Sequence, residues 1–413
     1  MMVAEATACP ETSFTAPRIL FERPLHCPAF ETTVAMQRSE ERILTTHVGS
    51  LIRPPELGAE NAKRPDRGLA DACLREAVTE VVAHQARIGL DIVNDGEYGK
   101  SSWANYILER VDGFEIRSNQ LQPVEWLGRD RDRFADFFAE EMPYALTGMP
   151  AQVCVGPIAY RDDDALARAI ANLEHALAAT GSKEAFMTVV APASAAYNGV
   201  NEYYASDHDY VFALADALRA EYRAVHDAGL VLQVDDAVLA NMYDSLVQQS
   251  PERYREWAQL RVDALNHALR GIPPERVRYH VCFGSWHVPH VADAPLEEII
   301  DLVLQVNAQA YSIEAANVRH EHEWRVWETV KLPPGKILIP GVVTHHTVSV
   351  EHPRLVADRI VRFARLVGRE NVIAGTDCGF SQTNNIERVH PSVMWAKLEA
   401  LVAGARLASA ELF

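Results

Sequence analysis

Four side chains that bind transition metals well occur in three strand-like stretches in the last third of the chain. His280 and Cys282 lie in the apolar stretch 278–284, and Glu314 and Cys378 lie in two later stretches. Because side chains two residues apart in a strand point to the same face, the imidazole and the first thiol can bind one ion. One imidazole, two thiols and a carboxylate suit a tetrahedral Zn²⁺ with a position that can open. The sequence therefore predicts a zinc site built by residues far apart in the chain.

A zinc ion held by two thiolates and a carboxylate is electron-rich, and this favours one kind of chemistry. Such an ion is a weak Lewis acid towards a carbonyl group, but it can bind the thiol of a substrate. Coordination removes the thiol proton near pH 7, where a free thiol with a pKa of about 8.5 is mostly protonated. We expect Glu314 to be the ligand that yields to the incoming sulfur. The reaction class that follows is S-alkylation of a small-molecule thiol by an alkyl donor.

Acidic residues and histidines near other strand ends are candidates for substrate binding and proton transfer. The acidic candidates are Asp95, Glu97, Asp235 and Asp236. They could bind a substrate ammonium group or act as acids and bases, and the alternative is a structural role in capping loops and helices. His346 follows another strand-like run and could protonate a leaving group. The alternative is that His346 is an ordinary polar side chain without a catalytic role.

The elements that must position these residues alternate between strand-like and helical runs along most of the chain. Such alternation predicts parallel strands joined by helical crossovers. Of roughly nine strand-like runs, the one near Cys154 is expected to pair with residues 114–117 outside the main sheet, and eight remain for an α/β fold, a closed (β/α)8 TIM barrel. We therefore predict a loosely ordered N-terminal arm over residues 1–40, without a catalytic role, and a single barrel domain over residues 41–413.

Functional groups of such barrels lie at the carboxyl ends of the strands, because the loops that follow the strands meet there. The residues expected at this end are Ser50, Glu97, Asp235, His280, Cys282, Glu314, His346 and Cys378. The sequence thus predicts that the metal ligands and the candidate acids share one face of the barrel.

Composition limits the partners of this chain. Lys and Arg number 39 and Asp and Glu number 57, which gives a formal charge of −18 and argues against nucleic acid and against an anionic membrane surface. Six scattered cysteines form no disulfide framework. The first ten residues lack the basic region of a signal peptide, and no apolar run reaches the length of about 18 residues that spans a membrane. We expect a cytoplasmic protein, and a homo-oligomer is compatible with the sequence.

Several motifs, taken in order, resemble those of the cobalamin-independent methionine synthase family. The chain is similar to the single-barrel members, which include epoxyalkane:coenzyme M transferase (2-hydroxypropyl-CoM lyase). The resemblance covers about residues 43 to 405. Its motifs are His47-Val-Gly-Ser50, Asp95-Gly-Glu97, Gln233-Val-Asp-Asp236, His280-Val-Cys282-Phe-Gly, Glu314-Ala-Ala-Asn-Val-Arg-His-Glu-His-Glu-Trp324, Pro340-Gly-Val and Gly375-Thr-Asp-Cys-Gly-Phe380.

The resemblance implies roles for individual residues. The implied zinc ligands are His280, Cys282, Glu314 and Cys378. The positions that hold the amino-acid part of homocysteine match Ser50, Glu97 and Asp235. The histidine that assists proton transfer matches His346. Catalytic roles are therefore expected for His346, Asp235 and Glu97.

Two departures from the family pattern concern the alkyl donor. The folate-facing segment with its tryptophan is missing after Pro192, and the stretch after Cys378 lacks the basic ending of the synthases. Methyl transfer from a folate-type or other donor to homocysteine is the default expectation, and addition of a coenzyme M-like thiol to an epoxide is the rival at the same site. Two readings from other classes are a metal-free barrel related to uroporphyrinogen decarboxylase and a non-catalytic module that binds zinc or thiols.

Overall fold

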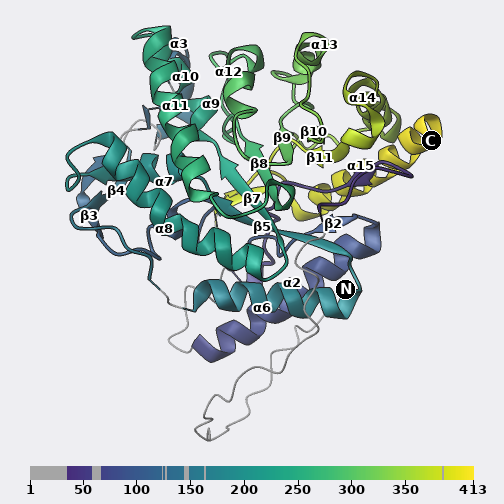
Figure 1. Ribbon diagram of the computed structural model, residues 1–413, viewed down its shortest axis with the longest axis horizontal. Helices are drawn as coiled ribbons and strands as arrows, with labels where there is room; N and C mark the ends of the chain where they lie inside the picture. Colours follow the sequence, from purple (N-terminus) through teal and green to yellow (C-terminus); the bar gives the residue numbers. More distant parts are fainter. Residues whose placement is uncertain are drawn as a thin grey trace, which may run out of the picture.

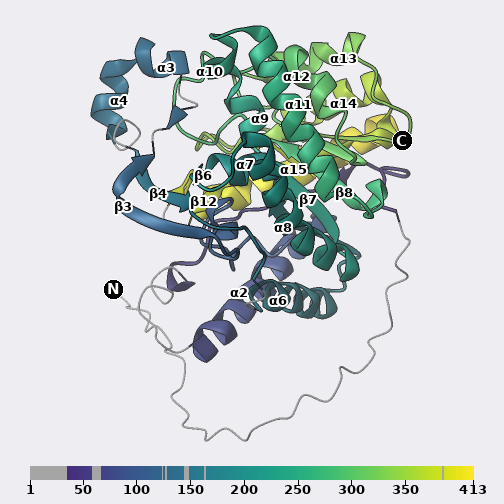
Figure 2. The ribbon, with the colours of Figure 1, turned by 60° about the vertical axis from the view of Figure 1, so that its left-hand side comes forward.

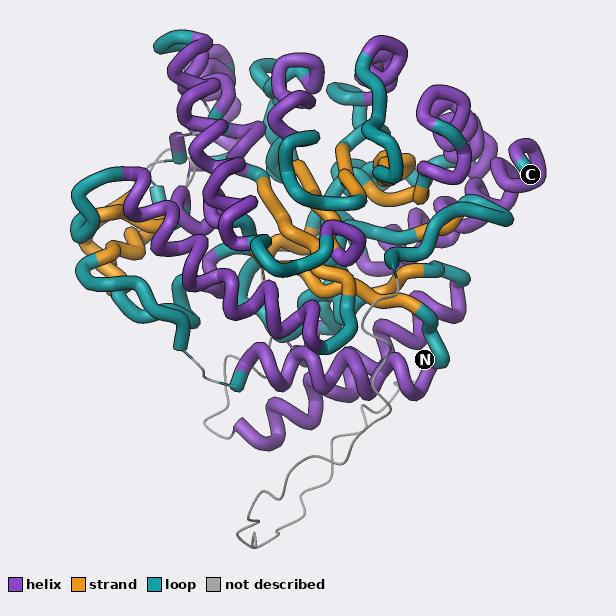
Figure 3. Tube along the Cα trace, in the orientation of Figure 1, coloured by secondary structure: helices purple, strands orange, loops and turns teal. Residues whose placement is uncertain are grey.

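Eight parallel strands form a ring at the centre of the molecule, and helices surround it (Figures 1 and 3). The computed structural model describes residues 35–57, 67–122, 124–125, 128–143, 148–161, 164–383 and 386–413. Neighbouring strands pair in the order β1-β11-β10-β9-β8-β7-β5-β2. Between the two end strands, the Asp91 amide donates to the Thr45 carbonyl oxygen at 3.1 Å, and the Thr46 hydroxyl donates to the Ile92 carbonyl oxygen at 3.2 Å. The predicted (β/α)8 barrel is confirmed.

The barrel strands have the following bounds. They are β1 (Leu44–Thr45), β2 (Ile92–Val93), β5 (Glu184–Val190), β7 (Val231–Asp236), β8 (Val277–Val281), β9 (Ala310–Ile313), β10 (Ile337–Val343) and β11 (Ile373–Thr376). Every residue of β5 and β7 is buried, as expected for parallel strands covered on both faces.

The longer helices follow the strands in turn. They are α2 (Arg67–Ile88), α6 (Ala165–Thr180), α8 (Asp207–Asp227), α11 (Pro251–Ala268), α12 (Leu296–Val303), α14 (Pro353–Val367) and α15 (Pro391–Leu412). Shorter helices are α3 (Gly128–Arg133), α4 (Ala135–Glu141), α7 (Pro192–Tyr197), α9 (Val238–Asn241), α10 (Tyr243–Val247) and α13 (Val326–Thr329). Within the described part of the chain, no helix combines the length and the apolar character needed to cross a membrane.

Glycines follow two of the helices. Gly89 follows α2 with a φ of +96°, and Gly368 follows α14 with a φ of +93°. A side chain would be strained in this left-handed region, so glycine allows the chain to leave the helix and enter the next strand.

The barrel interior is apolar at the amino ends of its strands. A buried cluster there combines Met36 with Leu44, Ile92, Phe186, Val231, Ala310, Ile337, Ile339 and Ile373. The predicted arm lies outside the described residues up to residue 34. Its last residues are held at the barrel, since the Met36 amide donates to the Glu275 carbonyl oxygen at 3.1 Å. Because this apolar cluster fills the barrel at the amino ends of the strands, polar side chains can gather at the carboxyl ends.

An insertion between β2 and β5 builds a small sheet outside the ring (Figures 1 and 2). Strand β3 (Phe114–Gln122) pairs antiparallel with β4 (Met149–Cys154), with Phe114 opposite Cys154, as the sequence predicted. Strand β6 (Gly199–Asn201) adds to β4 in parallel. A further two-stranded ribbon, β12 (Ser381–Thr383) with β13 (Ile386–Glu387), follows β11.

Candidate metal centre

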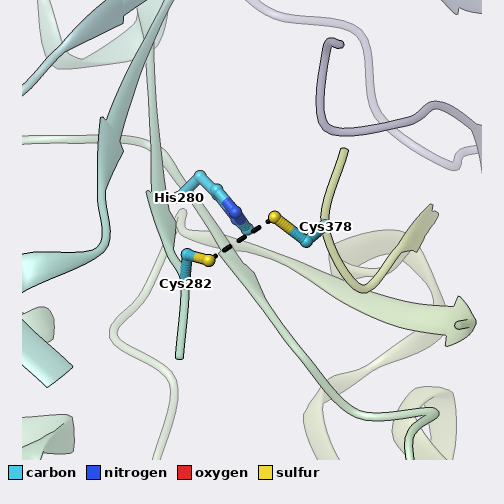
Figure 4. Close-up of side chains that lie close together, drawn as sticks. All are labelled: His280, Cys282 and Cys378. Atoms are coloured by element: carbon cyan, nitrogen blue, oxygen red, sulfur yellow. Dashed lines mark hydrogen bonds between the residues drawn. The ribbon is translucent and has the colours of Figure 1, made fainter. Parts of the chain in front are cut away.

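Three of the four predicted metal ligands meet at the carboxyl end of the barrel. His280 lies in β8, Cys282 follows that strand directly, and Cys378 follows β11. Their donor atoms all lie within 4.8 Å of one another, and each of the three side chains is buried. Figure 4 shows the two sulfur atoms facing each other with the His280 ring beside them. Strands β8 and β11, which are not neighbours in the sheet, thus bring these three side chains together, and we call the three the metal group.

The distances and the hydrogen bonding of this group fit a zinc ion. The sulfur atoms of Cys282 and Cys378 are 3.5 Å apart, far beyond the length of a disulfide. Two sulfurs bound to one tetrahedral zinc lie roughly 3.8 Å apart, given zinc–sulfur bonds of about 2.3 Å. Both ring nitrogens of His280 are buried without a hydrogen-bond partner among the described residues. A buried imidazole without partners is costly, and coordination of a cation by one nitrogen would satisfy it.

The protein around the two sulfurs supplies hydrogen-bond donors. The Gly284 amide donates to the Cys282 sulfur at 3.2 Å, and the Ser285 hydroxyl lies 3.0 Å from the Cys378 sulfur. The hydrogen bond with Cys378 and burial raise the pKa of Cys282 well above its usual range. A bound cation reverses this preference because it stabilises the thiolate. Ser285 was not predicted from the sequence. The one signal that could have found it is its position three residues after Cys282.

Glu314 follows β9 beside the metal group but is not part of it. One carboxylate oxygen accepts from the Phe283 amide at 3.0 Å, and the other accepts from the Asn317 side-chain amide at 2.8 Å. Burial, then the nearby Cys282, raises the pKa of Glu314 well above its usual range. The carboxylate is therefore adjacent to the metal ligands and held by neutral donors.

A cavity of about 430 Å³ opens over the metal group and contains the predicted substrate residues. Ser50, Glu97 and Asp235 line it together with all three metal-group residues. Glu97 comes close to the loop after β1 because Gly49 has no side chain: a Cβ there would lie 2.7 Å from a Glu97 carboxylate oxygen. The fold thus brings carboxylates and metal-binding side chains to one cavity.

The carboxylate of Glu97 is held in place by a short chain of hydrogen bonds. The Thr188 hydroxyl donates to Glu97 Oε1 at 2.9 Å, and the Lys100 ammonium group donates to the same hydroxyl at 2.6 Å. Arg53 donates to the Glu97 carbonyl oxygen at 2.7 Å. None of these three supporting residues was singled out from the sequence, because they lie on three different elements.

The ionisation of Asp235, which lines this cavity, is strongly perturbed. Burial and the neighbouring Glu97 raise the pKa of Asp235 to about 7, although Gln233 donates to it at 2.8 Å. Two carboxylates in one buried cavity resist full ionisation. A substrate ammonium group placed between them would allow both to ionise.

Replacing Asp235 by asparagine is expected to stabilise the protein more at pH 8 than at pH 5. Because the folded-state pKa is raised, the stability that the protonated carboxyl contributes is present below about pH 4 and is lost as the pH rises through about 7. Asparagine cannot ionise, so the variant escapes this loss. We expect its melting temperature to exceed that of the wild type by a few degrees at pH 8. Thermal melts of both proteins in the same metal state check this, and an equal difference at both pH values would contradict it.

The other two acidic candidates have structural partners. Asp236 accepts from the Ser194 and Tyr279 hydroxyls at 3.0 Å each and from two backbone amides at the start of α9. Asp95 accepts from the Glu97 amide at 2.9 Å. Asp236 therefore matches the structural alternative given above, since its hydrogen bonds fix a helix and a strand.

His346 contributes to a different cavity from the one over the metal group. It lines a neighbouring cavity of about 580 Å³ together with Glu314, and it is not among the residues that line the first one. Burial and the imidazoles of His290 and His287 lower the pKa of His346 to about 3. In this arrangement the ring is neutral at pH 7.

A buried network orders the loop that follows β8. His320 contacts Glu323 at 2.8 Å and Asp293 at 3.0 Å, and His290 contacts Asp293 at 3.0 Å. Burial opposes the charge of His320, but Asp293, Glu323 and Glu314 raise its pKa to about 10. This network anchors the loop that carries Ser285 over the metal group.

Comparisons with known proteins identify relatives of the chain. A family model described as cobalamin-independent synthase, catalytic domain, matches residues 192–398. The sequence is 23% identical to a methionine synthase of Thermococcus kodakarensis, over 86% of this chain and 88% of that protein. It is also 23% identical to the uncharacterised protein YxjH of Bacillus subtilis, over 91% of this chain and 98% of that one.

Solved structures show the same fold. A B12-independent methionine synthase from a Shewanella species, in complex with selenomethionine, superposes with a TM-score of 0.68 at 19% identity, covering 90% of this chain and 99% of the other. A Listeria monocytogenes structure assigned to the vitamin-B12-independent methionine synthases gives a TM-score of 0.60 at 20% identity, covering 88% and 98%. The likeness extends over nearly the whole length of both structures.

Proposed function

The chain belongs to the cobalamin-independent synthase catalytic-domain family, and on that premise we propose that it is a zinc-dependent transferase that alkylates the sulfur of a small thiol. The observation that carries this proposal is the buried group of His280, Cys282 and Cys378 at the floor of an open cavity. A bound zinc ion would supply one thing, a lowered pKa for the substrate thiol. Homocysteine is the acceptor we propose, as the methionine synthases among the relatives suggest.

The residues of the chain would bind and orient this acceptor. Glu97 and Asp235 line the cavity on the side of β2 and β7 and would hold the ammonium group, with Ser50 contacting the rest of the amino-acid part. The hydrogen bonds from Thr188 to Glu97 and from Gln233 to Asp235 fix these carboxylates before the substrate arrives. Such preorganisation places the thiol over the metal group in one orientation.

Titration of cobalt-substituted protein with homocysteine tests the acceptor site. We expect a new cobalt–thiolate absorption band, with 4-mercaptobutyrate, which is homocysteine without its ammonium group, binding roughly tenfold more weakly. In the variant Asp235→Asn the preference for homocysteine should shrink or vanish. The thiol without the ammonium group should bind to the variant as tightly as to the wild type. Absence of the band with both thiols in wild-type protein would overturn the proposal.

Product analysis distinguishes the reactions that such a site could perform. Purified zinc-loaded protein is given homocysteine with methyltetrahydrofolate, then coenzyme M with epoxypropane. Consumption of the second pair would assign an epoxide-opening lyase in place of a methyltransferase. Metal analysis of the purified protein addresses the remaining alternatives: no bound zinc favours a metal-free decarboxylase-like barrel, and zinc with thiol binding but no product favours a binding module.

A further inference from the structure

Apart from its carboxylates, the metal group and Arg388, which donates to the Gln382 side-chain oxygen, most of the cavity lining is apolar or carries carboxamides, and we call this part the aromatic half. Its apolar residues are Trp103, Val124, Met149, Pro150, Tyr197, Val238 and Trp286, and its carboxamides are Asn105, Gln122, Gln152, Asn198, Asn241 and Gln382. The insertion supplies several of them through β3 and β4. This half is where a second substrate would lie, so its chemistry bears on the alkyl donor.

One aromatic residue of this lining, Trp103, lies beside the sulfur atoms of the metal group. It packs against the buried cluster of Ala237, Cys282 and Cys378, and its amide donates to the Gln382 carbonyl oxygen at 3.0 Å. The backbone hydrogen bond fixes the indole at the edge of the metal group. A group bound in the cavity at the metal site can therefore contact the indole.

Acidic side chains outnumber basic ones in the described lining of the cavity. Among the described lining residues, the carboxylates are Glu97, Asp235 and Asp236, and Arg388 is the one residue that carries a permanent positive charge. Arg388 lies near the imidazoles of His287 and His346, whose pKa values it helps to lower. A donor with several negative charges would be repelled by these carboxylates, and a single guanidinium would offset that repulsion.

Proton transfer is also poorly provided for in the aromatic half. Its described lining offers carboxamides, indoles and the Tyr197 hydroxyl, which accepts a hydrogen bond from the Glu125 amide. His346 lines the other cavity, and Asp235 lies beside Glu97 on the acceptor side. A donor whose leaving group needs no proton fits this arrangement better than one whose leaving nitrogen must be protonated.

Resting on the proposed function, we propose that the alkyl donor is an onium compound, a sulfonium or a quaternary ammonium ion, seated against Trp103. Aromatic faces bind such cations, and the surplus of carboxylates favours them further. In the reaction the acceptor sulfur forms a bond to the methyl carbon as the bond from that carbon to the onium centre breaks. The electron pair of the broken bond stays on the leaving atom, which departs as a neutral sulfide or amine, and no proton is required.

The same step suits a cavity with apolar walls. Attack of a thiolate on an onium carbon cancels one negative and one positive charge. Separated charges are poorly solvated in an apolar cavity, so a reaction that removes them gains from such surroundings. The acceptor thiol releases its proton to solvent before the attack, and the balance of atoms and charge is complete.

Turnover with small onium donors tests this assignment. Zinc-loaded protein is incubated with homocysteine and either trimethylsulfonium or glycine betaine, with methyltetrahydrofolate and epoxypropane in parallel. We expect methionine and an equal amount of dimethyl sulfide from trimethylsulfonium. No methionine from either onium donor overturns the proposal. If folate supports turnover, or if homocysteine still binds the cobalt-substituted protein, only the donor assignment fails; if homocysteine does not bind, the proposed function fails with it.

A binding measurement isolates the role of the indole. Choline and its neutral isostere 3,3-dimethylbutan-1-ol are titrated into zinc-loaded wild type and the variant Trp103→Leu, which keeps an apolar side chain. We expect wild type to bind choline about tenfold more tightly than the neutral compound, and the variant to lose this preference. Trp395→Leu is the matched control, because Trp395 stacks on His84 outside the cavity. Equal affinity of wild type for both compounds contradicts the proposal.

Discussion

Replacing Cys378 by serine is expected to remove zinc from the purified protein and to abolish thiol alkylation. The sulfur of Cys378 lies 3.5 Å from that of Cys282, and a hydroxyl is a far weaker ligand for zinc than a thiolate. Changing a residue that only supports a ligand costs about 10- to 100-fold in metal affinity, so loss of a ligand should cost more than about 100-fold. Metal analysis and chelator competition measure this change.

A second cysteine provides the control for this substitution. Cys73 lies in α2, outside the metal group, and Cys73→Ser makes the same chemical change there. This variant should keep about one zinc per chain and the activity of the wild type. Retention of stoichiometric zinc by Cys378→Ser would show that Cys378 is not a ligand.

Replacing Arg110 by methionine is expected to lower the free energy of unfolding by about 3–5 kcal/mol. Arg110 donates to Glu221 of α8 at 2.8 Å, and the side chains are 8% and 1% exposed. Without the guanidinium, the Glu221 carboxylate stays buried, and the partners it keeps among the described residues are the hydroxyls of Tyr106 and Tyr160, at 3.2 and 3.0 Å. Urea denaturation measures the loss.

The second partner of this ion pair supplies a test of the mechanism. Adding Glu221→Gln to Arg110→Met removes the uncompensated charge while an amide oxygen still accepts from the tyrosines, so part of the lost stability should return. The exposed pair of Arg365 and Glu411 is the control, because Arg365→Met should cost less than about 1 kcal/mol. A double variant no more stable than Arg110→Met would contradict this account.

The loss of stability caused by the Arg110 substitution should also affect the aromatic half of the cavity. Val111 forms a bridge with Tyr160 at the base of the insertion, and Arg161 donates from its amide to the Arg110 carbonyl oxygen at 2.8 Å. Loosening this base would let β3 and β4 move relative to the barrel. We therefore expect the variant to lose affinity for the alkyl donor before it loses zinc.

The barrel and the grouping of His280, Cys282 and Cys378 could be predicted because both follow from local patterns. Apolar runs mark buried strands, glycines such as Gly89 mark helix ends, and parallel strands place their carboxyl ends at one edge of a barrel. Residues just past those ends must then be neighbours, however far apart they are in the chain. The hairpin of the insertion was also predicted, from its two short apolar runs.

Positions beyond the strand ends could not be predicted in the same way. Glu314 and His346 both follow barrel strands, yet Glu314 turns towards the Phe283 amide and His346 lines a second cavity. Loops lack a repeating pattern, so the direction of a side chain there depends on hydrogen bonds with other segments. Trp103 and Ser285 escaped notice for the same reason.

The sequence by itself determined which metal-binding types of side chain this protein offers, because two thiols and an imidazole lie at or just past strand ends that meet at one edge of a barrel. Only the tertiary structure decided which other groups share their cavity. It placed an indole and carboxamides from the insertion opposite two carboxylates, and it kept His346 apart. Contacts of this kind join segments distant in the chain, and their free energy depends on packing that no local pattern encodes.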